Sequence, residues 1–465
     1  MKTAAAPAIS PAVSHLAIHV AERGVRTPAS VLRCGIEDNV EFSTTSLQSY
    51  FFSRWDPIAW DALLVAAAVE FADKTQHRPI RLWRRSFDLR VPVHDPRLWN
   101  SSKVCATLRD ALQFLTGDDW QFEFVARKRA VERPEQIPLS LDPDTEAVIP
   151  FSNGLDSCAV GGLLEKQLGS RLVRIRLGPG QQDGKALAKK QKAFTRIPYD
   201  VSSGEKPFVE SSARSRGFKF ATISAIAAYL ANASRIIVPE SGQGALGPSL
   251  VTVGQAGEDY RSHPLFTRKM EAFVNALFGH AVVYEFPRIW HTKAETLREF
   301  IDKCKDTAWM TTKSCWQQNR QTAVGGKWRH CGICAACMLR RMSIHGAGQT
   351  EPKETYVWED LSARSFETGA AKDFDKNKIT KAMHEYAIAG ALHLDHLAAL
   401  LGSPANAPTL ELNAWHLSES LGLPERDVRK KQDRLLQQHS LEWKNFMNSL
   451  GKKSFIFDWL PGARP

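Results

Sequence analysis

A short polar turn follows an apolar run near position 150 and has the composition of a phosphate-binding loop. The apolar run is 147–151, and an amphipathic segment, 159–168, follows the turn. This order predicts a strand, a loop and a helix, and the N-terminus of such a helix presents backbone N–H groups to an anion. The residues expected to bind a phosphate group are Ser152, Asn153, Gly154, Leu155, Asp156 and Ser157. A carboxylate in this place suits Mg²⁺, which bridges to phosphate oxygens. An ordinary turn with a helix cap is the alternative.

Gly154 is expected to let the backbone approach a phosphate closely, and Asn153 is the next residue able to accept a positive φ.

A second glycine-rich stretch, around Gly184 and Lys185, does not form a Walker A motif. That motif would need glycine at position 179 and serine or threonine at position 186, where this chain has Pro179 and Ala186. We therefore reject a P-loop kinase.

Four of the eight cysteines gather late in the chain and have the spacing of metal ligands. A Cys-x-x-Cys-x-x-Cys run with one remote cysteine supplies four thiolates, the ligand count of a closed structural zinc site. Gly332 allows the tight turn between two of them. The alternatives are an iron–sulfur cluster and free thiols. The predicted ligands are Cys315, Cys331, Cys334 and Cys337.

These two motifs resemble those of a known family. Ser-Asn-Gly-Leu-Asp-Ser at 152–157 is similar to the Ser-Gly-Gly-X-Asp-Ser loop of the PP-loop ATP pyrophosphatases, with Asn153 where glycine is usual. Followed by Ser-Cys-Trp at 314–316 and His-Cys-Gly-x-Cys-x-x-Cys at 330–337, it resembles the QueC family of 7-cyano-7-deazaguanine synthases over 147–345. The additional N-terminal and C-terminal regions resemble the enlarged QueC-like proteins of anti-phage defence, notably the QatC type.

The resemblance implies a PP-loop, HUP-like fold and the cofactors ATP, Mg²⁺ and Zn²⁺. It implies adenylation of a 7-deazaguanine carboxylate, release of pyrophosphate, and attack by an amine. In the QatC type the amine belongs to a partner protein; in the synthases ammonia attacks and a nitrile results. Arg214 or Arg216 matches an arginine-rich segment that faces the nucleotide, where a guanidinium neutralises charge on the α-phosphate; a solvated helix face is the alternative. The candidate catalytic residues are Asp156, Arg214 and Arg216.

The elements that must position these residues alternate between strand and helix over 147–303. Strands are expected at 147–151, 171–177, 235–239 and 281–286, and helices at 211–232, 261–278 and 292–303. This alternation predicts an α/β domain with a doubly wound, mostly parallel sheet. The polar turn at 240–244 follows a predicted strand, so we expect it to contact the acceptor. The predicted domains are a tail at 1–14, an α+β domain at 15–131, a linker at 132–146, the PP-loop domain with its zinc knuckle at 147–345, and a helical region at 346–465.

The N-terminal domain is expected to contain a helix at 57–75, a helix near 107–115 and several short strands, one of them at 79–83. The C-terminal region is expected to contain a helix at 377–401 and a pair, 415–421 and 425–438, joined by a glycine turn. The spacing of this pair resembles a helix-turn-helix, but packing or partner docking is the preferred interpretation over DNA contact. The second helix of the pair carries Arg426, Arg429, Lys430, Lys431 and Arg434.

The bulk composition narrows the class of protein. The chain has 465 residues, 43% of them hydrophobic, and a formal net charge of +11, which favours anionic partners. The sequence contains no run of 18 apolar residues, so no membrane span is expected. The clustered cysteines suit a metal in the reducing cytoplasm.

The function expected first is an ATP-dependent, C–N bond-forming enzyme of ligase type. The alternatives are a free synthase, a tRNA-modifying PP-loop enzyme, and a non-catalytic zinc module that binds nucleic acid.

Overall fold

The computed structural model describes residues 14–42, 56–78, 84–129, 144–177, 194–197, 199–204, 207–210, 213–254, 256–317 and 322–460. The strand expected at 79–83, most of the expected linker and the stretch around Gly184 lie outside these residues. The chain divides into two compact units. The first comprises Met1–Asp144, Ile175–Ser234 and Lys269–Val283, and the second comprises Thr145–Arg174, Arg235–Arg268 and Tyr284–Pro465.

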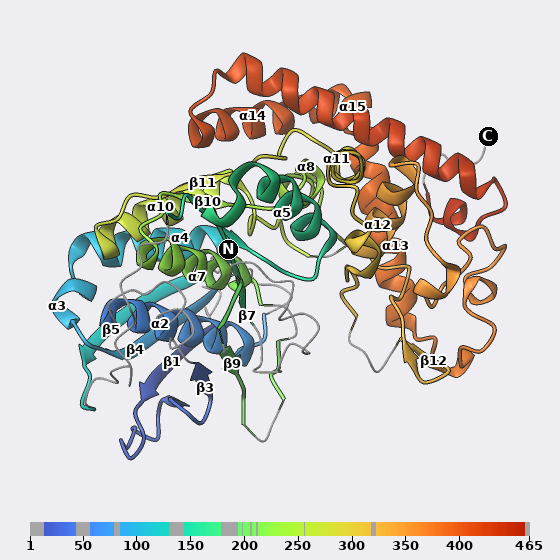
Figure 1. Ribbon diagram of the computed structural model, residues 1–465. Coiled ribbons are helices and arrows are strands. Elements are labelled where there is room, and N and C mark those ends of the chain that lie inside the picture. Colours follow the sequence, from blue (N-terminus) through green and yellow to red (C-terminus); the bar gives the residue numbers. More distant parts are fainter. Residues whose placement is uncertain are drawn as a thin grey trace, which may run out of the picture. The chain divides into compact units, whose positions relative to one another are not determined.

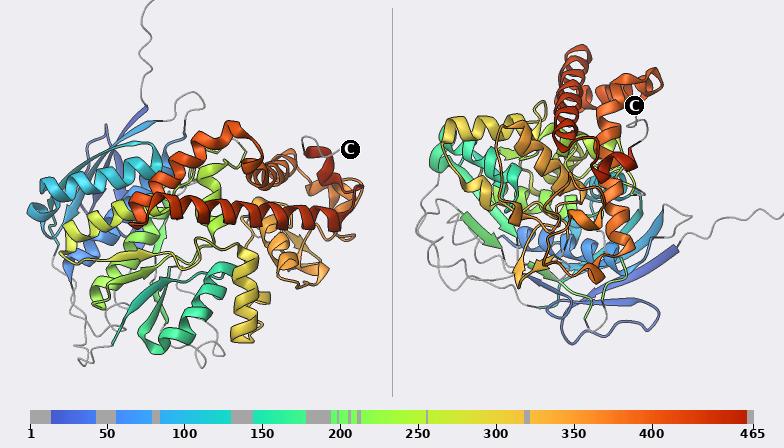
Figure 2. Two further views of the ribbon diagram at one scale, coloured as in Figure 1. Left: turned by 90° about the horizontal axis from the view of Figure 1, so that it is seen from above. Right: turned by 90° about the vertical axis from the view of Figure 1, so that its right-hand side faces the viewer.

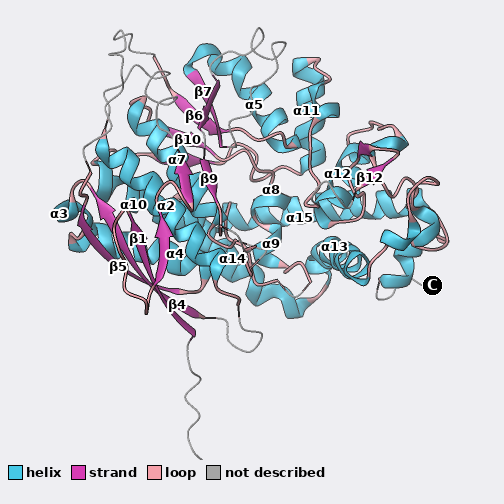
Figure 3. Ribbon diagram, turned by 90° about the horizontal axis from the view of Figure 1, so that it is seen from below, coloured by secondary structure: helices cyan, strands magenta, loops and turns pink. Residues whose placement is uncertain are grey.

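The first unit contains a four-stranded sheet in the order β2-β1-β4-β5 (Figure 3, magenta). Every neighbouring pair in it is parallel. Parallel neighbours need crossover connections, and α2, α3 and α4 lie between successive strands in the sequence. This region is therefore α/β, and not α+β as its sequence predicted. The strands are β1 (Ser14–Ala21), β2 (Leu32–Gly35), β4 (Arg85–Val93) and β5 (Asp119–Ala126).

Helix α2 (Pro57–Thr75) begins and ends where the sequence predicted, because Asp56 accepts a hydrogen bond from the amide of Ile58 and Pro57 occupies the first helical position. The remaining elements that belong wholly or partly to this unit include a short antiparallel pair, β3 and β9. They are β3 (Val40–Phe42), α3 (Pro96–Trp99), α4 (Ser102–Thr116), β8 (Phe194–Ile197), β9 (Tyr199–Val201), α7 (Arg216–Leu230) and α10 (Pro264–Phe278).

A second sheet has the order β11-β10-β6-β7-β8, and β10 pairs with β6 in parallel. Together with the first sheet and the helical C-terminus, it makes the protein a mixed α/β structure with parallel sheets. Its strands are β6 (Ala147–Pro150), β7 (Leu172–Leu177), β10 (Arg235–Ile237) and β11 (Val283–Glu285), besides β8.

The second unit is mostly helical after β11. Helices α12, α13 and α15 pack on one another (Figures 1 and 2) around a core that includes Cys331, Met338, Trp358 and Trp443. The elements are α5 (Leu155–Leu168), α8 (Gly242–Ala245), α9 (Gly247–Leu250), α11 (Lys293–Cys304), β12 (Ala323–Val324), β13 (Lys327–Trp328), α12 (Ala335–Gly346), α13 (Lys381–Ala399), α14 (Ala407–Leu421) and α15 (Glu425–Leu450), with short 3-10 turns between them. No helix in the described part of the chain is long and apolar enough to span a bilayer.

Helix α15 extends well beyond the predicted end at 438. The extension buries one side of the helix, including Trp443, Phe446 and Met447, against the unit's core. Gly422, which adopts a φ of 64°, ends α14 and allows the turn into α15. The helix pair is therefore confirmed, and its second member is part of the core of its unit.

A buried ionic network fixes the start of α7 in the first unit. Arg85 is fully buried and donates to Asp73 and to Asp118, the latter at 2.7 Å from Nη2 to Oδ2. The second carboxylate oxygen of Asp73 accepts from the backbone amide of Ser215 at 2.7 Å. Because Ser215 immediately precedes α7, this network positions the segment that carries the two candidate arginines.

We expect Arg85→Met to destabilise the first unit by roughly 3–5 kcal/mol. It removes the buried guanidinium from Asp73 and Asp118 and leaves these two carboxylates with Arg78 alone. Arg84→Met is the matched control, since Arg84 is exposed and pairs with Asp119 at the surface. Urea unfolding followed by circular dichroism measures both variants. The network would not have this role if the two substitutions shifted the unfolding midpoint equally.

Candidate functional site

The predicted phosphate loop lies between β6 and α5 in the second unit. Gly154 is the N-cap of α5, and no side chain caps the helix. Its first amides are thus left for another acceptor. The hydroxyl of Ser152 accepts from the Gly154 amide at 3.0 Å and lies 2.9 Å from the hydroxyl of Ser157. The loop therefore presents two hydroxyls and a helix N-terminus together, as an anion site requires.

Glycine at position 154 is explained by close approach and not by an unusual φ. Its φ is −80°, and Asn153 is not among the described residues with positive φ. A Cβ built at Gly154 would lie 2.9 Å from the hydroxyl oxygen of Ser152. A larger residue would thus push Ser152 away from its bond to the Gly154 amide.

Asp156 and Lys293 form an ion pair at the start of two helices. Asp156 is the second residue of α5, and Lys293 is the first residue of α11; both side chains are largely buried. The other carboxylate oxygen, Oδ1 of Asp156, is buried and accepts no hydrogen bond from the described residues. A buried oxygen with unused lone pairs fits a metal ligand, so Asp156 fits the Mg²⁺ that the sequence assigned to it.

A second carboxylate, Glu240, lies beside this pair at the end of the segment that follows β10. Burial, and after it the negative charge of Asp156, raise the pKa of Glu240 to about 7, although Lys293 and Arg261 oppose the shift. Near neutral pH Glu240 therefore becomes fully charged only when a bound cation or a higher pH draws its proton away.

A directional chain of hydrogen bonds connects Lys293 to the C-terminal helix. Nε2 of His439 in α15 lies 2.9 Å from the carbonyl oxygen of Leu394, so it carries the proton and Nδ1 is the acceptor. Nδ1 lies 2.8 Å from the side-chain nitrogen of Gln243, and the side-chain oxygen of Gln243 accepts from the amide of Lys293 at 2.8 Å. Burial lowers the pKa of His439 to about 4, which keeps the chain in this form at neutral pH.

Sequence reasoning missed Lys293 and His439 as parts of the site. It expected the turn at 240–244, which contains Gln243, to contact the acceptor, but it did not foresee the hydrogen bonds of Gln243 to these two residues. One local signal existed: Lys293 follows Thr292, whose capping box with Glu295 marks a helix start. A cation at a helix N-terminus is disfavoured by the dipole, and so it indicates a nearby anionic partner.

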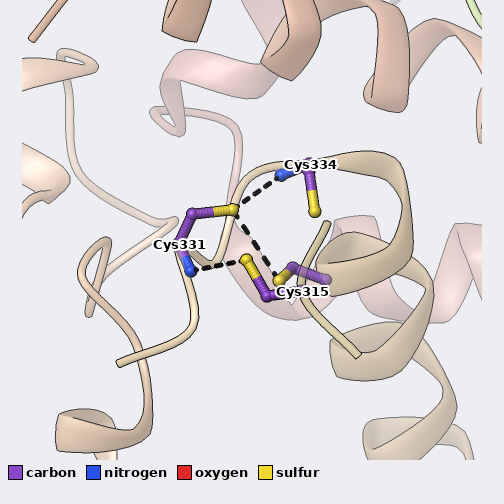
Figure 4. Close-up of side chains that lie close together, drawn as sticks. Cys315, Cys331 and Cys334 are labelled. Atoms are coloured by element: carbon purple, nitrogen blue, oxygen red, sulfur yellow. Dashed lines mark hydrogen bonds between the residues drawn. The ribbon is translucent and has the colours of Figure 1, made fainter. Parts of the chain in front are cut away.

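The four predicted cysteines come together within the second unit. Their sulfur atoms all lie within 4.8 Å of one another, and those of Cys331 and Cys337 are 3.8 Å apart. Zinc–sulfur bonds of ~2.3 Å in a tetrahedron require sulfur–sulfur distances of about 3.8 Å. The sulfurs of the three labelled cysteines point toward one another in Figure 4. The cluster therefore fits a structural zinc ion.

Backbone amides support this cluster. Cys331 donates its amide to the sulfur of Cys315 at 3.2 Å, and Cys334 donates to the sulfur of Cys331 at 3.3 Å. Such bonds favour thiolates, which are the form that binds metal. Gly332 has a φ of 88°, as expected for the turn between these two cysteines.

The cysteine cluster and the phosphate loop are linked through the segment before Cys315. The amide of Lys313 donates to the carbonyl oxygen of Asn153 at 2.6 Å. Arg340, one helical turn beyond Cys337 in α12, donates to the hydroxyl of Thr312 at 2.6 Å and pairs with Glu351. The segment between Thr312 and Cys315 is therefore held from both sides, and it holds the loop in turn.

The two candidate arginines belong to the first unit. Arg214 donates to the carbonyl oxygen of Thr116 at 3.4 Å, and the guanidinium of Arg216 lies 5.4 Å from the ring centre of Phe220. Their catalytic role stays a prediction. In the second unit, burial raises the pKa of Cys158, which follows the loop, to about 11, so this thiol is a poor nucleophile near neutral pH.

By its fold and site, the protein is a mixed α/β protein with a candidate anion-binding loop and a candidate tetrathiolate metal centre. A family model described as QueC, Queuosine biosynthesis protein QueC, matches residues 243–348. The match supports a QueC-like family for this chain, and with it an ATP-using enzyme of 7-deazaguanine-related chemistry. It includes Lys293 and the four cysteines, whereas the loop at 152–157 lies outside it. No curated protein matches the chain.

We expect Cys331→Ser to lose bound zinc and to make the second unit sensitive to protease. A structural zinc ion contributes roughly 10–16 kcal/mol in small domains, which is comparable with a typical total stability of about 5–15 kcal/mol. Cys304→Ser is the control, because Cys304 lies outside the cluster at the end of α11. Elemental analysis of purified protein and limited proteolysis measure both effects. Undiminished zinc in the Cys331 variant would contradict the assignment.

We expect the affinity for MgATP to rise with pH through about 7. Below that pH the raised pKa keeps Glu240 protonated, and each pH unit lower reduces the charged fraction about tenfold. Glu240→Gln removes the titrating group and flattens this dependence. Glu258→Gln, at an exposed carboxylate of the same unit, keeps it. Calorimetric titrations across pH measure the affinity. If the affinity of Glu240→Gln depended on pH as in the unmodified protein, the charge of Glu240 would not control MgATP binding.

Proposed function

We propose that this protein adenylates a 7-deazaguanine carboxylate with ATP and transfers the activated acyl group to an amine of a partner protein. One observation carries the proposal: Lys293, from the segment that matches the QueC model, pairs with Asp156 of a loop outside that segment. Two parts of the chain that are far apart in sequence thus contribute to one anion-binding site. The loop hydroxyls, the free amides of α5 and this ammonium group suit the pyrophosphate of ATP.

The proposed two-step reaction requires no covalent intermediate with the enzyme. A carboxylate oxygen attacks the α-phosphorus of ATP, the bond to the bridging oxygen of the β-phosphate breaks, and pyrophosphate leaves. The amine nitrogen then attacks the acyl carbon of the adenylate, AMP leaves, and the nitrogen loses a proton. Asp156 would hold Mg²⁺, with Glu240 beside it, and the ion would supply charge stabilisation for the leaving pyrophosphate. Ser152 and Ser157 orient the departing group, and the cysteine cluster, with zinc bound, holds the loop through Lys313.

The identity of the acceptor and the role in anti-phage defence belong to the same proposal. Their support is the resemblance of the enlarged chain to QatC-type proteins, with regions added on both sides of the QueC-like part. The main alternative is a free synthase that uses ammonia and makes 7-cyano-7-deazaguanine. The description of the matching family model, a queuosine biosynthesis protein, favours that alternative.

The proposal predicts ATP–pyrophosphate exchange that depends on 7-carboxy-7-deazaguanine, and AMP as the nucleotide product. Asp156→Asn is expected to reduce the exchange rate roughly 10²-fold or more, because the loop loses its metal ligand and the partner of Lys293. Asp302→Asn, at an exposed position of α11, should leave the rate unchanged.

Mass spectrometry of the products distinguishes the two functions. A partner protein that gains the deazaguanine acyl group supports the proposal, whereas a nitrile formed from ammonium supports the free synthase. Release of ADP and phosphate in place of AMP and pyrophosphate would exclude both.

A further inference from the structure

A hollow of about 390 Å³ lies on the surface of the second unit, separate from the phosphate loop. It is lined by Trp290, His291, Lys430, Lys431 and Arg434. Its volume is within the range of about 300–1,000 Å³ that is usual for ligand sites. Three cationic side chains, an imidazole and an indole line it, and none of the lining residues is acidic. This composition suits a ligand that carries both a phosphate and an aromatic base.

The hollow is held in shape by contacts that do not use its lysines. Arg434 donates to the carbonyl oxygen of Trp290 at 3.0 Å and pairs with Glu295, which ties α15 to the segment before α11. Trp290, which is partly buried, packs on the apolar cluster that contains Ile289 and Leu435. The indole and the helix are therefore fixed relative to each other before any ligand arrives.

The lysines, in contrast, keep their charge available. Lys430 and Lys431 are exposed and form no ion pair within the described part of the chain, and the ammonium of Lys431 lies 5.9 Å from the ring centre of Trp290. Of the nearby acids on α15, Asp433 already pairs with Arg429, and Asp427 lies one turn before the lysines. The surface of the hollow is thus positively charged beside an aromatic ring.

We propose that this hollow binds single-stranded nucleic acid, with one base stacked on Trp290 and the neighbouring phosphates on Lys430 and Lys431. Stacking on an aromatic ring beside a basic track is how proteins bind single strands. The exposed basic residues continue along α15 from Arg426 to Arg434, which spans about 12 Å of helix at 1.5 Å per residue. That length exceeds one phosphate group and suits a chain of phosphates better than a mononucleotide. The site goes beyond the adenylation function and does not depend on it.

Fluorescence anisotropy with a labelled oligonucleotide of about 12 nucleotides, without ATP, tests the site. We expect Lys430→Ala/Lys431→Ala to weaken binding roughly tenfold and to reduce the slope of log affinity against log salt by about 1.4, or about 0.7 for each phosphate that a lysine no longer neutralises. The control is Lys452→Ala/Lys453→Ala, which removes the same charge from exposed positions just after α15. An equal loss of affinity in both double variants would overturn the proposal.

Variants of Trp290 test stacking separately from charge. Trp290→Leu is expected to weaken binding roughly 5- to 150-fold, and Trp290→Phe, which retains a ring, to keep most of the affinity. Equal losses of affinity in the two variants would overturn stacking and with it the proposal. So would tighter binding of the same sequence as a duplex, or equal competition by a polyglutamate peptide of the same charge. Since no ATP is present, each result is independent of adenylation activity.

Discussion

The candidate site depends on the four-sulfur cluster, because that cluster fixes the segment on which the phosphate loop rests. Cys315 is held by the other cysteines, and two residues earlier Lys313 donates its amide to Asn153 of the loop. Arg340 fixes the same segment through Thr312. Four thiolate ligands would leave a bound metal ion no open position for catalysis. Loss of the ion would nevertheless release a support of the loop, although the cysteines are not among the residues proposed to bind ATP.

The C-terminal helix provides the second support. Within the second unit, α15 reaches the start of α11 through three kinds of contact: His439 through Gln243, Glu442 through the hydroxyl of Thr292, and Arg434 through Glu295. All three end within four residues of one another, around Lys293. Because the buried histidine is neutral and its tautomer is set by Leu394, the support keeps its geometry near neutral pH. The C-terminal region is therefore part of the framework of the candidate site.

The sequence predicted those features that depend on residues close to one another along the chain. The cysteine spacing predicted a cluster that the structure brings together, and Pro57 predicted the start of α2. Contacts between distant residues carry no comparable local signal. Lys293 is 137 positions from Asp156 and Gln243 is 196 positions from His439, so only the folded chain reveals them. The parallel pairing of β1 with β4 was missed for the same reason, since short alternating strands do not specify the direction of their partners.

The charges around Asp156 explain why Lys293 belongs to the site. In the free protein the ammonium compensates one carboxylate, and a raised pKa keeps Glu240 largely uncharged below about pH 7. In the function proposed above, ATP brings several negative charges to the N-terminus of α5, and its metal ion compensates only part of them. Asp156 then serves the metal, and Lys293 is left to pair with a phosphate oxygen at the place where negative charge develops as pyrophosphate departs. Before ATP binds, Asp156 and Lys293 neutralise each other, so the site folds without an unpaired buried charge. After ATP binds, each pairs with a new partner, and a cation remains where the reaction needs one.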